Sequence, residues 1–126
     1  MKSYDPLRAP DPREWQSVDE AQRISLVKAY HRRTRAKLPD AQAHATIHVI
    51  VENQIAMGDE IPVRATLERL MREGLDRHNA VHAIGCVLTN HLQHVLHQPR
   101  ERENPEYPYF VELKSFTAAK WYKDFG

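Results

Sequence analysis

The stretch of sequence that decides the fold is DAQAHATIHVIVENQIAM, residues 40–57. Its centre, Ile47 to Val51, is rich in Val and Ile and has the composition of a β-strand when it is taken alone. Alanines at positions 41, 43, 45 and 56 favour a helix instead, and the whole segment has a typical helical length. We therefore predict a helix that Asp40 caps and that ends at Gly58, where glycine suits a left-handed C-terminal cap.

Capping residues, prolines and glycines divide the rest of the chain into further helices. Asp11-Pro12 begins the first, and Ser17-Val18-Asp19-Glu20 has the pattern of a capping box. The expected helices are a short one from residue 12, a longer one that Pro39 ends, the helix at 40–57, one at 62–74, one at about 77–97 and a last short one near Ser115. No segment shows sustained period-two alternation. The predicted fold class is therefore all-α, a small multi-helix bundle with an extended, aromatic-rich C-terminal arm.

The length of 126 residues predicts a single domain over residues 1–126. Its expected parts are an N-terminal arm at 1–11, a helical core at 12–97, and a linker and C-terminal arm at 98–126, with residues 98–109 extended. Seven of the ten aromatic residues fall in the last 20 positions, so this arm must cover something. They are Tyr107, Tyr109, Phe110, Phe116, Trp121, Tyr122 and Phe125. The arm either folds back over its own bundle or docks on a second subunit, which leaves self-association open.

Charge and cysteine content exclude several classes of protein. Eighteen Lys and Arg against 17 Asp and Glu give a net charge of +1, which argues against a dedicated nucleic-acid binder. The single cysteine, Cys86, excludes an internal disulfide framework and fits a reducing compartment. No apolar run is long enough for a membrane span, and the start lacks the apolar region of a signal peptide. We therefore expect a cytoplasmic protein.

Histidines occur at regular helical spacing. His44, His48 and Glu52 stand at i, i+4 and i+8, and His78, His82 and Cys86 repeat this spacing. Residues four apart share one helix face, so each histidine pair can grip one metal ion. If the helices at 40–57 and 77–97 pack side by side, four imidazoles converge on an all-nitrogen site for zinc, copper, nickel or iron.

Glu52 has three possible roles in such a site: a fourth ligand beside three histidines, an outer partner that orients His48, or a base for a bound water. The chain has no His-Glu-x-x-His motif of metalloproteases and no Glu-x-x-His motif of di-iron carboxylate bundles. The alternative to metal binding is a polar seam in which the histidines hydrogen-bond across facing helices. Histidines grouped on one face also titrate near neutral pH, which allows a pH-responsive module.

Two runs carry a family resemblance. His44-Ala45-Thr46-Ile47-His48-Val49-Ile50-Val51-Glu52-Asn53-Gln54, followed by Arg69-Leu70 and by His78-Asn79-Ala80-Val81-His82-Ala83, is similar to a bacterial family catalogued as domain of unknown function 1841. The resemblance covers about residues 43–92. It implies a small helical protein in which these positions matter, and it implies no particular activity.

Other residues have plainer interpretations. Three histidines lie near a predicted helix C-terminus: His91, His94 and His97. There they can donate hydrogen bonds to the free carbonyls and interact favourably with the helix dipole. Gly85 lies inside a predicted helix and indicates close packing against the alanines of the helix at 40–57. A buried lone cysteine such as Cys86 is most often a small apolar side chain.

The sequence thus supports two hypotheses. The first is a small helical protein that binds a transition metal, zinc or iron, through His44, His48, His78 and His82, with Glu52 as a ligand or an outer partner. The second is a non-enzymatic homodimer or interaction module that uses the aromatic arm, with the histidines as a structural seam. The residues specify neither a substrate nor a reaction, so whether the protein is an enzyme stays open.

Overall fold

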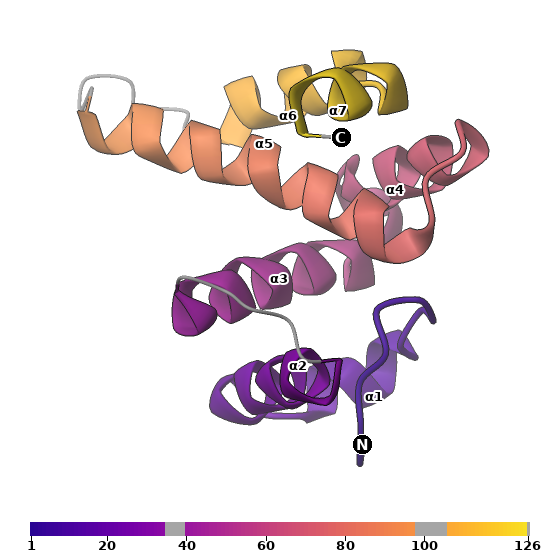
Figure 1. Ribbon diagram of the computed structural model, residues 1–126, viewed down its shortest axis with the longest axis vertical. Helices are drawn as coiled ribbons and strands as arrows, with labels where there is room; N and C mark the ends of the chain where they lie inside the picture. Colours follow the sequence, from indigo (N-terminus) through magenta and orange to yellow (C-terminus); the bar gives the residue numbers. More distant parts are fainter. Residues whose placement is uncertain (35–39, 98–105, 126) are drawn as a thin grey trace.

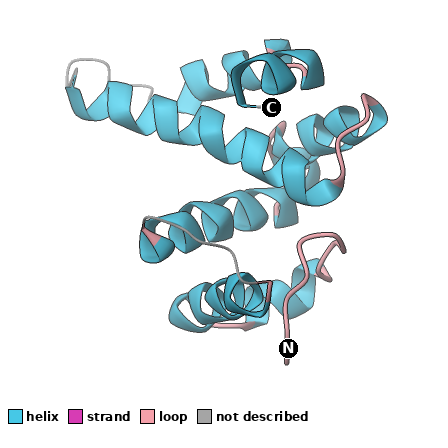
Figure 2. Cartoon of the chain, in the orientation of Figure 1, coloured by secondary structure: helices cyan, strands magenta, loops and turns pink. Residues whose placement is uncertain are grey.

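The computed structural model describes residues 1–34, 40–97 and 106–125. Within these ranges the chain forms seven α-helices and one short 3₁₀ turn, with no β-strand (Figure 2). The elements are α1 (Pro12–Ser17), α2 (Glu20–Arg33), α3 (Ala41–Ala56), η1 (Gly58–Glu60), α4 (Val63–Arg72), α5 (Arg77–His97), α6 (Glu106–Ser115) and α7 (Ala118–Phe125). The predicted all-α bundle is confirmed. None of the helices described is both long enough and apolar enough to cross a bilayer.

Aspartate side chains cap the starts of four helices; the caps at Asp11 and Asp40 were predicted, whereas α2 is capped by Asp19 rather than by Ser17 of the predicted capping box. Asp11, Asp19, Asp40 and Asp76 accept hydrogen bonds from backbone N–H groups in the first turns of α1, α2, α3 and α5. The Val- and Ile-rich segment 47–51 lies in the middle of α3. Gly58 follows α3 with a φ of +68°, in the left-handed region that favours glycine.

The helices form layers, with α3 near the centre (Figure 1). Helices α1 and α2 pack on one side of α3 and α5 packs on the other, so α3 and α5 lie side by side. Helix α4 packs against α3, α5 and α6, while α6 and α7 cover the face of α5 that is turned away from α3. This arrangement gives α3 a neighbour on two opposite faces.

Buried apolar side chains form two clusters, and α3 contributes to both. Ala45 and Val49 belong to a smaller cluster with Tyr4, Trp15 and Val27. Val51 belongs to a larger one that contains most of the buried apolar residues of α4, α5 and α6. Helix α3 also carries two buried polar side chains, His48 and Glu52, where it meets α5. The fold therefore buries a polar layer beside its two apolar clusters.

The C-terminal segment differs from the sequence-based expectation. Residues 106–109 belong to α6 rather than to an extended linker, Ser115 ends that helix, and the next one begins at Ala118. Pro108 fits the first turn of α6 because the N–H groups there have no partner within the helix. The expected linker at 98–105 lies outside the residues that the structure describes.

The described part of the arm folds back over its own chain. Tyr109 and Phe116 are buried in the larger apolar cluster. Arg69 Nη2 donates hydrogen bonds to the backbone carbonyls of Leu113 and Phe116, at 3.0 and 2.6 Å. Of the two positions that the sequence left open for the arm, the described residues thus take the intramolecular one. The side chains of Tyr107 and Phe125 lie outside the described part.

Gly85 lies where α5 packs tightly against α3, as its place in the sequence predicts. A Cβ at this position would be 3.2 Å from Ile47 Cγ2 and 3.9 Å from Val51 Cγ2. The close neighbours are therefore branched side chains rather than the alanines that the sequence suggested. A larger residue at 85 would have to push α3 and α5 apart.

We predict that Gly85→Leu lowers the free energy of unfolding by about 1–3 kcal/mol, the usual cost of overpacking a filled core. Urea denaturation followed by circular dichroism measures this change in the free energy of unfolding. Asn90→Leu, at an exposed position of the same helix, is the matched control and should change stability by no more than about 0.5 kcal/mol. Equal stability of the two variants would show that the contact at Gly85 is not tight.

Candidate metal centre

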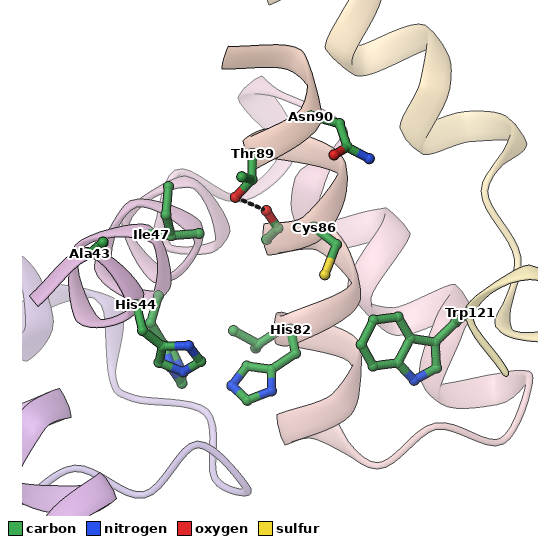
Figure 3. Close-up of a pocket in the computed structure, with 11 residues that line it drawn as sticks. Ala43, His44, Ile47, His82, Cys86, Thr89, Asn90 and Trp121 are labelled. Carbon is green, nitrogen blue, oxygen red and sulfur yellow. Dashed lines mark hydrogen bonds between the residues drawn. The ribbon is translucent and has the colours of Figure 1, made fainter. Parts of the chain in front are cut away.

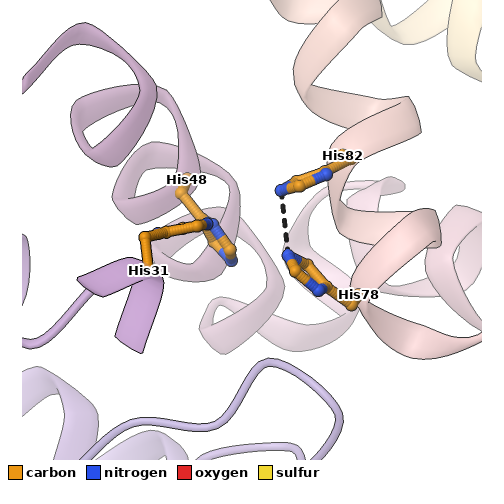
Figure 4. A group of neighbouring side chains, drawn as sticks. All are labelled: His31, His48, His78 and His82. Atoms are coloured by element: carbon orange, nitrogen blue, oxygen red, sulfur yellow. Dashed lines mark hydrogen bonds between the residues drawn. The ribbon is translucent and has the colours of Figure 1, made fainter. Parts of the chain in front are cut away.

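Four histidines from three helices converge in the layer between α2, α3 and α5 (Figure 4). They are His31 of α2, His48 of α3, and His78 and His82 of α5. One nitrogen from each ring lies within 4.8 Å of the corresponding nitrogen of every other. Two nitrogens bound to one tetrahedral zinc are about 3.3 Å apart, given bonds of about 2.0–2.1 Å. The separations between these nitrogens therefore exceed those of a tetrahedral zinc site by no more than about 1.5 Å.

Backbone contacts of α2 fix the orientation of His31. Its Nδ1 lies 2.9 Å from the carbonyl oxygen of Val27, one turn earlier in the same helix. A carbonyl only accepts hydrogen bonds, so Nδ1 carries the proton and Nε2 of neutral His31 keeps its lone pair. His31 is 6% exposed, and its Nε2 points into the cluster at 3.2 Å from Nε2 of His44.

A chain of buried side chains sets the tautomer of His48. Arg77 donates two hydrogen bonds to Glu52, from Nη1 to Oε2 and from Nη2 to Oε1, each 2.8 Å long. The Tyr4 hydroxyl donates a short hydrogen bond to Glu52 Oε2, and its oxygen lies 2.7 Å from His48 Nε2. Because the single hydroxyl proton goes to Glu52, the Tyr4 oxygen must accept from a protonated His48 Nε2. Neutral His48 then has a bare lone pair on Nδ1.

That Nδ1 is buried and has no hydrogen-bond partner within the described residues. Native proteins satisfy nearly all their buried polar atoms, so an orphaned acceptor in a cluster of acceptors calls for an explanation. A histidine that donates one N–H to an oxygen anchored by a carboxylate, while its other nitrogen stays bare, has the usual arrangement of a metal ligand.

The environment favours the neutral form of His48, His78 and His82 and of the neighbouring His44. Burial, reinforced by the neighbouring histidines, lowers the pKa of His44 and His78 and holds the pKa of His48 well below its ordinary value. For His82, burial and the proximity of His78, His44 and His31 lower the pKa to about 3. Nearby Asp76, Asp5 and Glu52 partly offset the effect at His78. Neutral imidazole is the form that binds metals.

The side chains that the structure brings together differ from the predicted ligand set in two places. His48, His78 and His82 lie in the cluster as expected, but its fourth member is His31 rather than His44. His44 lies just outside, with its ring centroid 4.6 Å from that of His31 and 4.9 Å from that of His82.

Glu52 does not face the cluster as a free ligand. Both its oxygens are engaged, by Arg77 and by Tyr4. Of the roles open to it, the contacts support that of an outer partner, which orients His48 through the hydroxyl of Tyr4.

Three residues of the site escaped sequence reasoning: His31, Tyr4 and Arg77. His31 had a signal in the sequence, since it lies seven positions after Ile24 and four after Val27, a spacing that places the three residues on one helix face. Tyr4 lies in a segment with no helical period. Arg77 follows a capping aspartate, where an arginine has no reason to be buried.

A pocket of about 470 Å³ adjoins the cluster (Figure 3). His44 and His82 lie at one end of it, and Thr89 and Asn90 lie toward the other. His48 and His82 therefore belong both to the four-histidine cluster and to the pocket lining.

The remaining candidates have structural roles. Burial raises the pKa of the Cys86 thiol, so this side chain is a neutral part of the pocket wall. The His91 ring is buried and its centroid lies 5.9 Å from that of Tyr109. His94 is exposed, and the side chain of His97 lies outside the described residues.

Comparison with protein-family models, with curated proteins and with solved structures finds no match for this chain. The resemblance to domain of unknown function 1841 is therefore a hypothesis, and the function has to be argued from the site itself.

We predict that the metal-free protein loses stability as the pH falls from 7.5 to 5. In the unfolded chain each histidine has a pKa of about 6.5. Below that pH the unfolded state binds more protons than the folded state, whose rings resist protonation, so the free energy of unfolding decreases. The decrease continues toward the folded-state pKa, which is about 3 for His82.

Thermal denaturation with chelator present measures this slope. His82→Gln should flatten it, by at most about 1.4 kcal/mol per pH unit, whereas His94→Gln, at an exposed position, should leave it unchanged. A melting temperature independent of pH over this range would contradict the prediction.

We also predict that Arg77→Met is strongly destabilising. The side chain of Glu52 is 1% exposed and that of Arg77 is 4% exposed, so removing the arginine leaves a buried carboxylate unpaired, at a cost of about 3–5 kcal/mol. The matched control is Arg64→Met, which removes the exposed pair with Asp59 and should cost no more than about 1 kcal/mol. Urea denaturation compares them, and similar costs would refute a structural role for the buried pair.

Proposed function

We propose that this protein binds one transition-metal ion, zinc or iron, between α2, α3 and α5. The ligands are Nε2 of His31, His78 and His82 and Nδ1 of His48. One observation carries the proposal: the bare, buried Nδ1 of His48, whose opposite nitrogen is anchored through Tyr4 to Glu52. An all-nitrogen set of neutral imidazoles suits zinc, copper, nickel and iron rather than magnesium or calcium.

The ring contacts support the same assignment. His78 Nε2 and His82 Nε2 lie 3.0 Å apart. Two nitrogens that bind one ion at about 2.0–2.1 Å have a similar separation. In the metal-free protein one of the two neutral rings carries its proton on Nε2, between the two nitrogens, and metal binding requires the other tautomer of that ring, with the proton on Nδ1.

We also propose that the chain belongs with the family catalogued as domain of unknown function 1841. The two runs that carry the resemblance contribute His48, Glu52, His78 and His82, all of which lie in or beside the proposed centre. Helix α2, which contributes His31, lies outside the compared region.

A structural polar seam is the second candidate function of these histidines. The pairs His31–His44 and His78–His82 lie at hydrogen-bond distance without an ion, at 3.2 and 3.0 Å. In this alternative the protein is an interaction module, and self-association has to use side chains that the bundle leaves exposed. Val111 and Tyr122 are exposed large apolar side chains of the described arm.

Metal analysis of the untagged protein, expressed in medium supplemented with zinc and iron, separates the two candidates. We predict about one equivalent of bound metal by mass spectrometry; less than about a tenth of an equivalent would favour the seam. His31→Ala should abolish stoichiometric binding, while His44→Ala and His94→Ala should retain it. If His44→Ala loses the metal and His31→Ala keeps it, the ligand assignment is wrong although a metal binds.

Tyr4→Phe tests the outer partner. It removes the oxygen that accepts from His48 Nε2 and should weaken metal affinity by about 10–100-fold without removing a ligand. Competition with a zinc chelator measures the change.

A further inference from the structure

The pocket beside the four histidines has a composition that points to a class of ligand. Apart from the histidines, most of its lining is apolar: Ala43, Ile47, Val81, Gly85, Cys86 and Trp121, with Thr89 and Asn90 as the polar members. Thr89 directs its hydroxyl to the carbonyl of Gly85, at 2.8 Å. The volume of the pocket, about 470 Å³, lies in the range of about 300–1,000 Å³ that small-molecule sites occupy.

The wall formed by Trp121 is fixed in place. Helix α7, which carries Trp121, begins at Ala118, whose N–H donates to Glu73 Oε1 at 2.9 Å. Glu73 is in turn paired with Arg69, which also binds two carbonyls at the end of α6. The two helices of the arm are thus tied to α4, and the indole forms a wall of the pocket opposite α3 (Figure 3).

The charge balance at the inner end is the second observation. Four neutral imidazoles leave a divalent ion with its full double positive charge. The nearest buried carboxylate, Glu52, is already neutralised by Arg77. The Cys86 thiol stays protonated because burial raises its pKa. A positive charge in apolar surroundings favours an anionic oxygen from outside the protein.

Resting on the metal centre proposed above, we propose that this pocket binds a small apolar monocarboxylate. One carboxylate oxygen coordinates the ion beside His48 and His82, and the apolar part lies between Ile47 and Trp121. His44, at the same end of the pocket, is placed to hydrogen-bond the second oxygen. Zinc accommodates a fifth ligand, and iron a fifth and sixth, so four histidines do not exclude this contact.

Benzoate is the probe, and cobalt(II), whose visible spectrum reports coordination, replaces the native ion in the full chain. Cobalt content is measured first, and benzoate, acetate and benzamide are then titrated separately. We expect benzoate to change the cobalt spectrum with an affinity at least tenfold tighter than acetate, which lacks the apolar part, and than benzamide, which lacks the charge.

Two variants test the position of the ligand. Trp121→Ala should weaken the affinity for benzoate several-fold and leave the affinity for acetate unchanged. Tyr122→Ala, at the exposed neighbour on the same helix, should change neither affinity. Bound benzoate should also slow alkylation of Cys86 by N-ethylmaleimide in the cobalt-loaded protein, which gives a readout independent of the spectrum.

The outcomes separate the two proposals. If cobalt binds stoichiometrically but benzoate binds no more tightly than acetate, the pocket proposal is wrong and the metal centre stands. Equal binding of benzamide would show an apolar site without anion selectivity and overturn the ligand class. If no cobalt binds, the metal centre is wrong and the pocket proposal is wrong with it.

Discussion

The bidentate pair between Arg77 and Glu52 is the interaction on which the rest of the structure depends. Glu52 lies on α3 and Arg77 is the first residue of α5, so the pair sets where α5 starts against α3. Arg77 Nη1 also donates to the carbonyl of Pro6, 71 positions earlier, at 2.9 Å. Burying both charges is costly, and the hydrogen bonds among Glu52, Arg77, Tyr4 and the Pro6 carbonyl offset that cost, although Arg77 Nε has no partner within the described residues. The pair therefore joins three distant segments in one geometry.

This pair also determines the chemistry of the histidines beside it. Were Glu52 unpaired, its negative charge would stabilise an imidazolium and raise the pKa of the nearby rings. With Arg77 in place that charge is paired, and its remaining effect is a partial one at His78. Burial and the neighbouring histidines keep the pKa of His48 and His82 low. Glu52 then acts on His48 through the Tyr4 hydroxyl, by fixing which nitrogen carries the proton. The same contact thus organises the fold and, through Tyr4, fixes the tautomer of His48.

Features encoded locally could be predicted from the sequence, whereas contacts between distant segments could not. Aspartate caps, the helix at 40–57 and the approach of α5 at Gly85 follow from spacing and residue type, because each depends on neighbours in the chain. The i, i+4 histidines of α3 and α5 were found for the same reason. His31 could not be assigned to the site because its place depends on how α2 crosses α3. Tyr4 was missed since it lies in an irregular segment, and Pro108 gave a false linker signal because proline is tolerated in a first helical turn.

The choice between a polar seam and a metal centre turns on the balance of donors and acceptors. A seam that evolved only to join helices would leave each ring nitrogen either donating or accepting, because an unsatisfied buried polar atom costs about 1–3 kcal/mol. Here the backbone fixes the proton of His31 on Nδ1, and Tyr4 fixes that of His48 on Nε2, so both rings present lone pairs to the same small volume. His44 Nε2 lies 3.2 Å from His31 Nε2 and can donate to it, whereas His48 Nδ1 has no hydrogen-bond partner within the described residues. A cation would satisfy this buried lone pair of His48, and that is the physical reason to favour the metal centre over the seam.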